Sequence, residues 1–330
     1  VPLFAGIYKK GAGLGPAITF LFFAPAANIL ALSYTGVAIG MDLAIARLLL
    51  SLTFGIGIGM IMALIFRRED AVHDEQTNDA FGRQDRVPTR NWAFLVLLVA
   101  LLLSGTLKIG LLTNSYAEVT LPIAGVDSFQ AALDRLVPYD ASKGEEGLSV
   151  QGVILVVLLA LIGVSAWKGL NHVDEGYNRW TWVTLILIVL TLLVAGFGMV
   201  ARPEGLHIRF LGKSFAVAVA LIALGALAHR AFDEYEIQEW LWESWRFVKQ
   251  IFPLVIVGVF VVGVVRGLID PAWIQVLAGR NTVLANLVGV IFGVFMYFPT
   301  LVEVPIAKMF LSLGMHRGPL IAYLMADPEL

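Results

Sequence analysis

The chain of 330 residues has no cysteine and few charged residues. The absence of cysteine excludes disulfide bonds, thiolate metal sites and iron–sulfur clusters within this sequence. Charged residues make up 15% of the chain and hydrophobic residues 58%, whereas an average soluble domain has about 25% and about 45–50%. So few charges cannot cover a water-facing surface. The composition therefore excludes an ordinary soluble enzyme and a disordered chain.

Several motifs of soluble function are also absent. The net charge of −2 provides no basic field for nucleic acid. The sequence contains no HExxH, GxSxG or Walker GxxxxGK(S/T) motif, and its five histidines form no pair within an apolar run. We therefore expect no enzymatic activity, no cofactor, no resident metal and no nucleic-acid partner.

The sequence does contain long apolar runs. A helix needs about 20 apolar residues to cross the hydrocarbon core of a membrane. Six runs reach this length. A seventh run, 283–299, is shorter and rich in glycine, and two more runs are interrupted by proline. The sequence thus predicts an all-α polytopic membrane protein with about eight or nine transmembrane segments. The six full-length runs are 42–66, 92–113, 149–167, 180–200, 210–228 and 250–268.

The two ends of the chain repeat one pattern. When residues 1–27 are placed over 304–330, eight positions are identical, and five of these eight are glycine or proline. In the apolar runs 13–32 and 318–330, a Gly-Pro pair is followed nine residues later by a second proline. Proline removes a backbone donor and disfavours helix in the residue before it. Both runs are therefore predicted to be broken or re-entrant helices, in repeats whose relation, inverted or parallel, stays open.

The repeat sets the predicted domain organisation. Residues 1–66 form a first repeat, with a broken helix and a span, and 283–330 form a truncated second repeat. The region 67–282 contains the intervening transmembrane helices. We expect the natural chain to continue beyond both ends, because this sequence opens at Val1-Pro2 and stops just after the last proline of a broken helix.

Loop charges predict the orientation in the membrane. The loop 67–91 holds five arginines, whereas the loop 114–148 holds six acidic residues against two basic ones. Lysine and arginine are enriched on the cytoplasmic side, so 67–91 is predicted to be cytoplasmic and 114–148 external. The Trp-rich stretch 231–249 then falls inside. It is either an amphipathic interfacial helix or a solvated linker.

Broken helices also predict a substrate site. Lipid cannot satisfy free N–H and C=O groups, so a break is tolerated only where protein or a polar cavity covers it. Two breaks at matching places favour a site near the middle of the bilayer, and half-helix N-termini suit an anion or electronegative ligand. The alternative is that the prolines are kinks packed against neighbouring helices. The predicted substrate-binding residues are Gly11, Gly15, Pro16, Thr19, Pro25, Asn28, Thr300, Glu303, Gly314, Gly318, Pro319, Asp327 and Pro328.

The polar candidates have different expected roles. Glu303 either binds a proton or a cation, or lies in water at the interface. Asp327 comes directly before the repeated proline and is expected inside the second break. Asn28 either binds substrate or caps freed backbone, while Thr19 and Thr300 are expected to bond back to helix carbonyls. Glu303 or Asp327 is the predicted coupling group for protons.

Two further features concern buried charge and close packing. Arg47 lies within a span, where it either pairs with an acid across the bundle or, as we favour, snorkels to the interface. Two GxxxG motifs, at 55–59 and 289–293, predict closely packed helices. We favour static contacts there over a surface that slides during transport.

Two long motifs carry a family resemblance. The runs VPLFAGIYKKGAGLGPAITFLFFAPAANILAL and GVFMYFPTLVEVPIAKMFLSLGMHRGPLIAYLMADPEL cover about 70 residues at the two ends. They resemble the predicted-permease family that includes YraQ-like proteins and ArsP-type organoarsenical efflux permeases. The resemblance implies a polytopic permease of the inner membrane. Members often carry cysteines before the first Val-Pro, but the matching position of the second repeat reads Tyr297-Phe298-Pro299-Thr300, so arsenic specificity is not carried over.

Two classes of function follow from these observations. The favoured one is a secondary transporter or efflux permease that moves a small solute through a site at the two broken helices. The alternative is a non-transporting scaffold or anchor subunit that docks through Trp240 or Trp245. In either case the expected partners are the lipid bilayer, a small molecule or ion, and a homo-oligomer or larger membrane complex.

Overall fold

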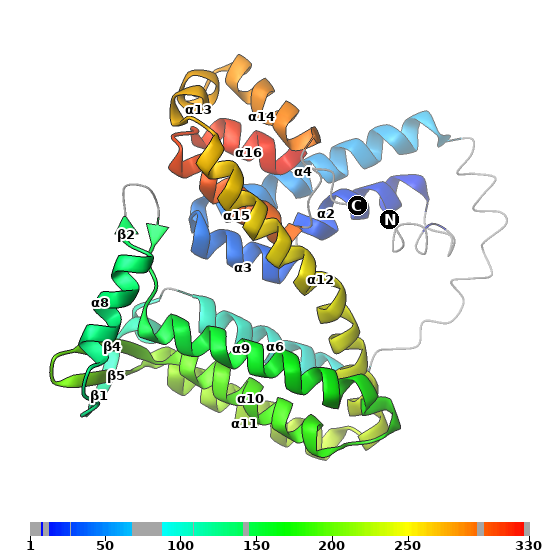
Figure 1. Ribbon diagram of the computed structural model, residues 1–330. Coiled ribbons are helices and arrows are strands. Elements are labelled where there is room, and N and C mark those ends of the chain that lie inside the picture. The colour runs from blue at the N-terminus through cyan, green and yellow to red at the C-terminus, as the bar shows by residue number, and fades with distance from the viewer. Residues whose placement is uncertain are drawn as a thin grey trace. The chain divides into compact units, whose positions relative to one another are not determined.

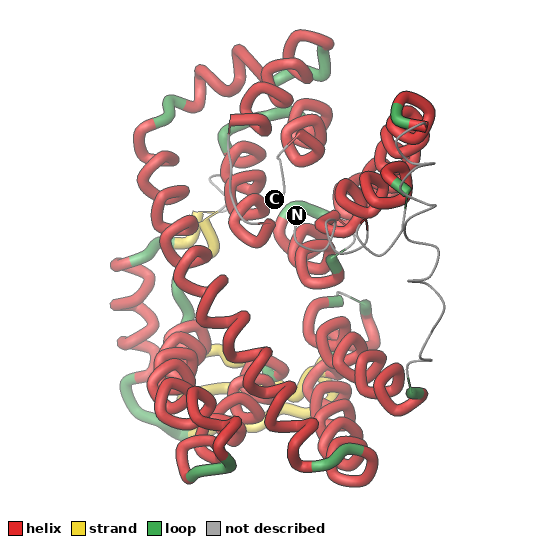
Figure 2. The backbone as a smooth tube through the Cα atoms, turned by 90° about the vertical axis from the view of Figure 1, so that its right-hand side faces the viewer, coloured by secondary structure: helices red, strands yellow, loops and turns green. Residues whose placement is uncertain are grey.

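The computed structural model describes residues 8, 13–26, 28–67, 88–107, 109–140, 145–295 and 300–326. The predicted helical membrane fold is confirmed. Helices make up most of the described chain, and the few strands lie between residues 115 and 211 (Figure 2). Seven segments are long and apolar enough to cross a membrane, namely Leu14–Ala38, Met41–Ile65, Thr89–Thr106, Val150–Glu175, Arg179–Gly196, Gly212–Ala231 and Glu234–Leu268.

The observed segments differ from the predicted ones at their ends. The helix that begins at Thr89 ends at Thr106, and the helix that begins at Arg179 ends at Gly196, because strands follow shortly after each. The predicted span 250–268 belongs to a helix that already begins at Glu234 and contains Pro253. The Trp-rich stretch is therefore the first part of a long helix and not a linker.

The chain divides into two compact units, which are described separately. The first comprises 1–87 together with 254–330, and the second comprises 88–253. The helix α12 (Glu234–Leu268) begins in the second unit and ends in the first.

The first unit is built from both ends of the chain. Its other described helices pack in pairs, α2 with α4, α14 with α16, and α15 with α3. Figure 1 shows the blue N-terminal helices beside the orange and red C-terminal ones. These helices are α2 (Leu14–Ala26), α3 (Ile29–Ala38), α4 (Met41–Ile65), α13 (Pro271–Ala278), α14 (Val283–Phe295), α15 (Thr300–Ser312) and α16 (Arg317–Ala326).

The apolar core of this unit is centred on α15 and α16. Phe310 of α15 stacks on Phe292 of α14, with ring centroids 5.7 Å apart, and meets the Tyr323 ring edge-on at 5.5 Å. Apolar side chains of α3, α4 and α13 complete the cluster. Aromatic pairs of this kind add about 0.5–1.5 kcal/mol beyond the burial of their area. The two ends of the chain are thus joined by one continuous core.

Both GxxxG motifs make the close contacts predicted for them. Gly55 and Gly59 face α2, where a Cβ added at Gly59 would lie 2.7 Å from the Gly15 carbonyl oxygen. A Cβ at Gly289 would collide with the Pro319 carbonyl oxygen. Small residues at these positions let the helix backbones touch. The prediction of tight helix packing is confirmed at both motifs.

The second unit is a helical bundle with a small sheet at one end (Figure 1). The helices pack α9 with α10, α6 with α11, and α10 with α11. The short helix α8 contacts β4 and β5. The helices are α6 (Thr89–Thr106), α7 (Gly110–Thr113), α8 (Val126–Leu136), α9 (Val150–Gly169), the 3-10 helix η2 (Leu170–Glu175), α10 (Arg179–Gly196) and α11 (Gly212–Ala231).

The sheet joins two loops that the sequence predicts on the external side. Strands β1 (Ser115–Leu121), β5 (Gly205–Leu211) and β4 (Gly198–Arg202) form an antiparallel sheet in the order β1-β5-β4. Glu118 of β1 lies opposite Arg209 of β5, an arrangement of opposite charges that stabilises antiparallel strands. A separate small pair joins β2 (Tyr139–Asp140) to β3 (Glu145–Glu146). The strands that come from the loops 114–148 and 201–209 therefore lie on one side of the bundle.

Gln151 ties the bundle to this sheet. Its amide nitrogen donates to the carbonyl oxygens of Val194 and Phe197, at 2.9 and 2.8 Å, and its oxygen accepts from the Met199 amide at 3.3 Å. These carbonyls lie at the C-terminal end of α10, where carbonyl groups run out of N–H donors within the helix. The side chain thus satisfies backbone groups at the point where the helix becomes a strand.

The Trp-rich part of α12 is partly built into the core of the second unit. Trp245 is 7% exposed and packs with Leu170, Val173 and Leu241. Its indole N–H donates to the Asn171 side-chain oxygen at 3.3 Å, and Lys249 donates to the same oxygen at 2.6 Å. A change at Trp245 would remove core packing, so this residue is not an exposed docking residue.

Candidate functional site

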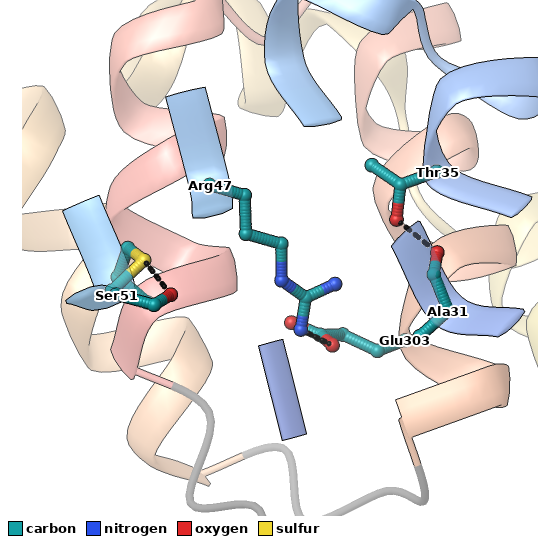
Figure 3. A network of polar contacts seen from close by, with 6 residues as sticks. Ala31, Thr35, Arg47, Ser51 and Glu303 are labelled. Carbon is teal, nitrogen blue, oxygen red and sulfur yellow. Dashed lines mark hydrogen bonds and ion pairs between the residues drawn. The ribbon is translucent and has the colours of Figure 1, made fainter. Parts of the chain in front are cut away.

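A buried ion pair joins the two ends of the chain inside the first unit. Arg47, the seventh residue of α4, places its Nη2 atom 2.6 Å from Oε2 of Glu303 on α15. The side chains of Arg47 and Glu303 are 2% and 0% exposed. Figure 3 shows the two side chains pointing toward each other between the helices. Our favoured interpretation, that Arg47 snorkels to the interface, is wrong, and the alternative of an acidic partner across the bundle is confirmed.

Glu303 is held by apolar neighbours at the start of its helix. It is the fourth residue of α15, between Val302 and Val304, which are both fully buried. The interpretation of Glu303 as an interfacial residue in water is therefore wrong. A carboxylate in the first turn is favoured by the free amides and partial positive charge of the helix N-terminus. The helix N-terminus and the guanidinium thus both place positive charge beside the carboxylate.

Other buried polar side chains lie near the pair. The hydroxyl of Thr35 on α3 donates to the Ala31 carbonyl oxygen at 2.8 Å, and the hydroxyl of Ser51 on α4 contacts the Met325 sulfur at 3.4 Å (Figure 3). Both residues are buried. Such polar groups are rare in an apolar unit, and here they come from the helices that surround the ion pair.

Three contacts in succession connect α4 to the C-terminal helices. Asp42 pairs with Arg317 of α16 at the exposed end of α4. Arg47 pairs with Glu303 of α15, and Ser51 contacts Met325 of α16. These contacts span nine residues of α4, which is about 14 Å along a helix. The helix α4 is thus fixed to α15 and α16 along more than two turns.

The first Gly-Pro segment is interrupted later than the Gly-Pro pair itself. The helix α2 runs without a break from Leu14 to Ala26, with Pro16 as its third residue and Pro25 as its next-to-last. Proline is tolerated in the first turn, where its missing N–H would have no partner. The interruption follows Pro25, before α3 begins at Ile29.

The structure places three of the predicted site residues in one groove. Gly15, Pro16 and Thr19 line an almost wholly apolar groove of about 410 Å³ between α2 and α4, together with Ile56 and Met60. The Thr19 hydroxyl donates to the Gly15 carbonyl oxygen at 3.0 Å, as expected for threonine in such a helix. The Arg47–Glu303 pair is not among the lining residues of this groove.

Asn28 caps the helix that follows the interruption. Its side-chain oxygen accepts a hydrogen bond from the Leu30 amide at 3.0 Å, at the N-terminus of α3. The predicted role of Asn28 in capping freed backbone is confirmed. An N-cap of this type contributes about 1 kcal/mol to helix stability.

The second Gly-Pro segment begins after a tight turn. Gly314 has a φ of +98°, and the Met315 amide donates to the Phe310 carbonyl oxygen at 2.9 Å, which ends α15. Glycine is favoured at such a left-handed position. Gly318 and Pro319 are then the second and third residues of α16, and Pro319 is buried against Gly289.

Several predicted residues lie outside what the structure describes. Gly11, Asp327 and Pro328 are outside the described residues, as are the side chains of Pro25 and Thr300. Of the remaining candidates, only Glu303 belongs to the ion-pair site. Arg47 is the residue that the sequence signalled, as a charge inside a span, but that we did not include. Thr35 and Ser51 carried no signal that distinguished them from other hydroxyls in helices.

The described residues contain no group of three histidine, aspartate or glutamate side chains placed to hold a metal ion. Within this part of the chain, the chemistry of the site is therefore that of one buried acid, one buried base and a few hydroxyls. Such a set can hold a proton or change its ion-pair partner.

Comparison with known proteins identifies the family. Residues 1–330 match the family ArsP_1, described as predicted permease. The chain belongs to this family. It is 28% identical over 330 residues to the UPF0718 protein MJ0584 of Methanocaldococcus jannaschii, an alignment that covers all of this chain and 67% of that protein. No solved structure matches the sequence. The resemblance seen in the terminal motifs is confirmed, and the protein is a multi-pass membrane permease.

Proposed function

We propose that this permease is a secondary transporter for a small solute and that the Arg47–Glu303 pair couples solute movement to protons. The observation that carries the proposal is the complete burial of this pair between helices from the two ends of the chain. Ionisable residues inside a membrane protein are costly and typically serve transport pathways or proton relays. The absence of an ATP-binding motif in the sequence agrees with transport that is passive, ion-coupled or driven by a partner.

The pair provides a physical basis for two conformations. When Glu303 takes up a proton, the charge pairing with Arg47 is lost, and breaking a buried ion pair from one side costs about 3–5 kcal/mol. That free energy is enough to shift an equilibrium between two packings of α4 against α15 by more than 100-fold. Besides Arg47, the charged groups on the helices packed nearby include the exposed pair of Asp42 and Arg317, Lys308 on α15 itself, and Arg266 on α12, which packs on Val302.

The solute is proposed to pass where the repeated segments change direction, after α2 and before α16. The support is structural similarity between the segments. Gly15-Pro16 and Gly318-Pro319 occupy the second and third positions of their helices, and each helix packs on a GxxxG helix. We further propose that the chain is not an enzyme, that it resides in the inner membrane, and that it acts in efflux. The arginine-rich loop 67–91 and the family resemblance support this location.

Flux measurements test the proposed transport. The purified chain is reconstituted in proteoliposomes, and the movement of labelled small anions, cations and neutral solutes is followed with and without a pH gradient. We expect at least one solute to move faster than in protein-free liposomes, at a rate that changes with the gradient. The Arg47→Gln variant should lose this flux, whereas Glu204→Gln, in the exposed β4–β5 turn, should keep it. Wild-type liposomes that move no solute in either direction would contradict the proposal.

A further inference from the structure

A mixed aromatic and acidic cavity lies in the second unit, away from the ion pair. It has a volume of about 310 Å³ and lies between the start of α6, the corner that joins α11 to α12, and the first turns of α12. Its lining combines apolar rings with carboxylates. The lining residues that matter here are Asn91, Phe94, Phe232, Glu236, Glu239 and Trp240.

The aromatic wall of this cavity is fixed by ring contacts. The ring of Phe94 lies 5.2 Å from that of Phe232, in a tilted arrangement, and 5.2 Å from that of Trp240, edge to face. Phe94 is buried, whereas Trp240 is 38% exposed. Side chains held in this way lose little conformational freedom when a ligand binds. The wall is therefore preorganised, with Trp240 as the accessible member.

The protein already places one cation against this wall. The guanidinium carbon of Arg90 lies 5.2 Å from the centre of the Phe232 ring. Its nitrogens donate to the Ala231 carbonyl oxygen at 2.7 Å and to the Glu236 carboxylate at 2.6 Å. Arg90 thus neutralises Glu236 and holds the corner between α11 and α12.

The second carboxylate of the cavity has no such cation. Glu239 lies one turn after Glu236 on the same side of α12, it is exposed, and no lysine or arginine in the described part of the chain forms a salt bridge with it. Two carboxylates and one guanidinium leave the cavity with one net negative charge. This sign favours a cation that also has an apolar surface over an anion.

We propose that this cavity binds an organic ammonium group, with its charge between the Glu239 carboxylate and the Trp240 ring and its carbon atoms against Phe94. Aromatic rings attract alkylammonium ions through their negative faces, best for tryptophan. The group comes either from a phospholipid headgroup or from a soluble amine, because both present the same chemistry. The site is independent of the transport proposed for the first unit.

Choline is a suitable probe, since its neutral carbon isostere, 3,3-dimethylbutanol, has the same shape without the charge. The full chain is placed in nanodiscs of phosphatidylglycerol, and each compound is titrated by calorimetry against empty discs as the background. We expect saturable binding of choline and none of the isostere. Glu239→Gln should weaken choline binding about two- to fivefold, and Trp240→Leu about three- to tenfold. Trp240→Phe keeps an aromatic ring and should lose less choline affinity than Trp240→Leu.

Glu243→Gln is the matched control, because Glu243 is an exposed acid one turn further along α12 that pairs with Arg246 and does not line this cavity. It should bind choline as the wild type does. Replacing half of the lipid by phosphatidylcholine identifies the source: loss of choline binding there indicates a lipid headgroup as the occupant, and retained binding a soluble amine. The proposal is overturned if choline does not bind, if the isostere binds equally well, or if Glu239→Gln and Trp240→Leu bind as tightly as the wild type.

Discussion

At the scale of single residues, the Arg47–Glu303 pair is the feature with the largest energetic consequence. Two charges are removed from water in an apolar unit, and their attraction repays this cost only while both are present. Breaking such a pair is therefore worse than replacing it altogether. This asymmetry gives a direct stability test.

We predict that Arg47→Met and Glu303→Met each lower the free energy of unfolding by about 3–5 kcal/mol, because each leaves one buried charge without its partner. The double variant should lose much less than the sum of the two. Denaturant unfolding in detergent, arranged as a double-mutant cycle, measures these values. Additive effects of the two substitutions would show that the side chains do not interact.

A second test concerns the glycine that ends α15. Gly314 has a φ of +98°, and a Cβ there would also approach the Gln275 side chain. Gly314→Ala should therefore lower the stability by about 1–2 kcal/mol. Gly225→Ala, in the interior of α11 with no atom near its Cβ position, is the control and should not destabilise. Equal effects of the two changes on the unfolding midpoint would contradict the assigned turn.

At the scale of elements, close contacts between helices organise the first unit. The helix α4 touches α2 through Gly55 and Gly59 on one side and contacts α15 and α16 through polar side chains on another. Its small residues and its charges thus serve different neighbours. Both sets lie on a helix that hydropathy alone reports only as one apolar span.

We predict that Gly59→Ala destabilises the protein by about 1–3 kcal/mol, because the added methyl group has no space between α4 and α2. Gly57→Ala on the same helix meets no atom within 4 Å and should be neutral or slightly stabilising, since alanine favours helix over glycine. Thermal unfolding of both variants in detergent compares them. A neutral Gly59→Ala would mean that α2 and α4 are further apart than described.

The sequence predicted the features that depend on the residues of a single element. Runs of apolar residues predicted the spans, and glycine spacing predicted the close contacts at 55–59 and 289–293. It failed for β1, because all seven residues from Ser115 to Leu121 are exposed and the alternation of polar and apolar residues covers only part of the strand. Its partner β5 lies some 90 positions away along the chain, where the alternating residues 206–210 are divided between a short loop and the start of a predicted span.

The ion pair could not be predicted as a pair. Glu303 and Arg47 are separated by 256 positions, and each is compatible with an interfacial position when considered alone. Only the packing of α3, α4 and α15 brings them together. The Gly-Pro segments were recognised from the sequence. The helix is interrupted after Pro25 and not at Pro16, because proline is tolerated in the first turn of a helix.

At the scale of the whole molecule, the absence of cysteine makes the membrane topology directly testable. The substitutions Glu204→Cys and Ser128→Cys place single cysteines on the side of the sheet. Asp174→Cys places one beyond the other end of α9. We predict that a membrane-impermeant maleimide added to intact cells labels the first two and not the third. Lysed cells provide the control, where all three should react. Labelling of Asp174→Cys in intact cells would reverse the predicted orientation.

The role of Glu303 is tested by comparing two kinds of flux in proteoliposomes that contain the Glu303→Gln variant. Glutamine keeps the shape of the side chain but cannot exchange a proton. We predict that the variant still exchanges labelled for unlabelled solute across the membrane, and that a pH gradient no longer drives its accumulation. Accumulation by Glu303→Gln at the wild-type rate would show that this carboxylate does not couple transport to protons.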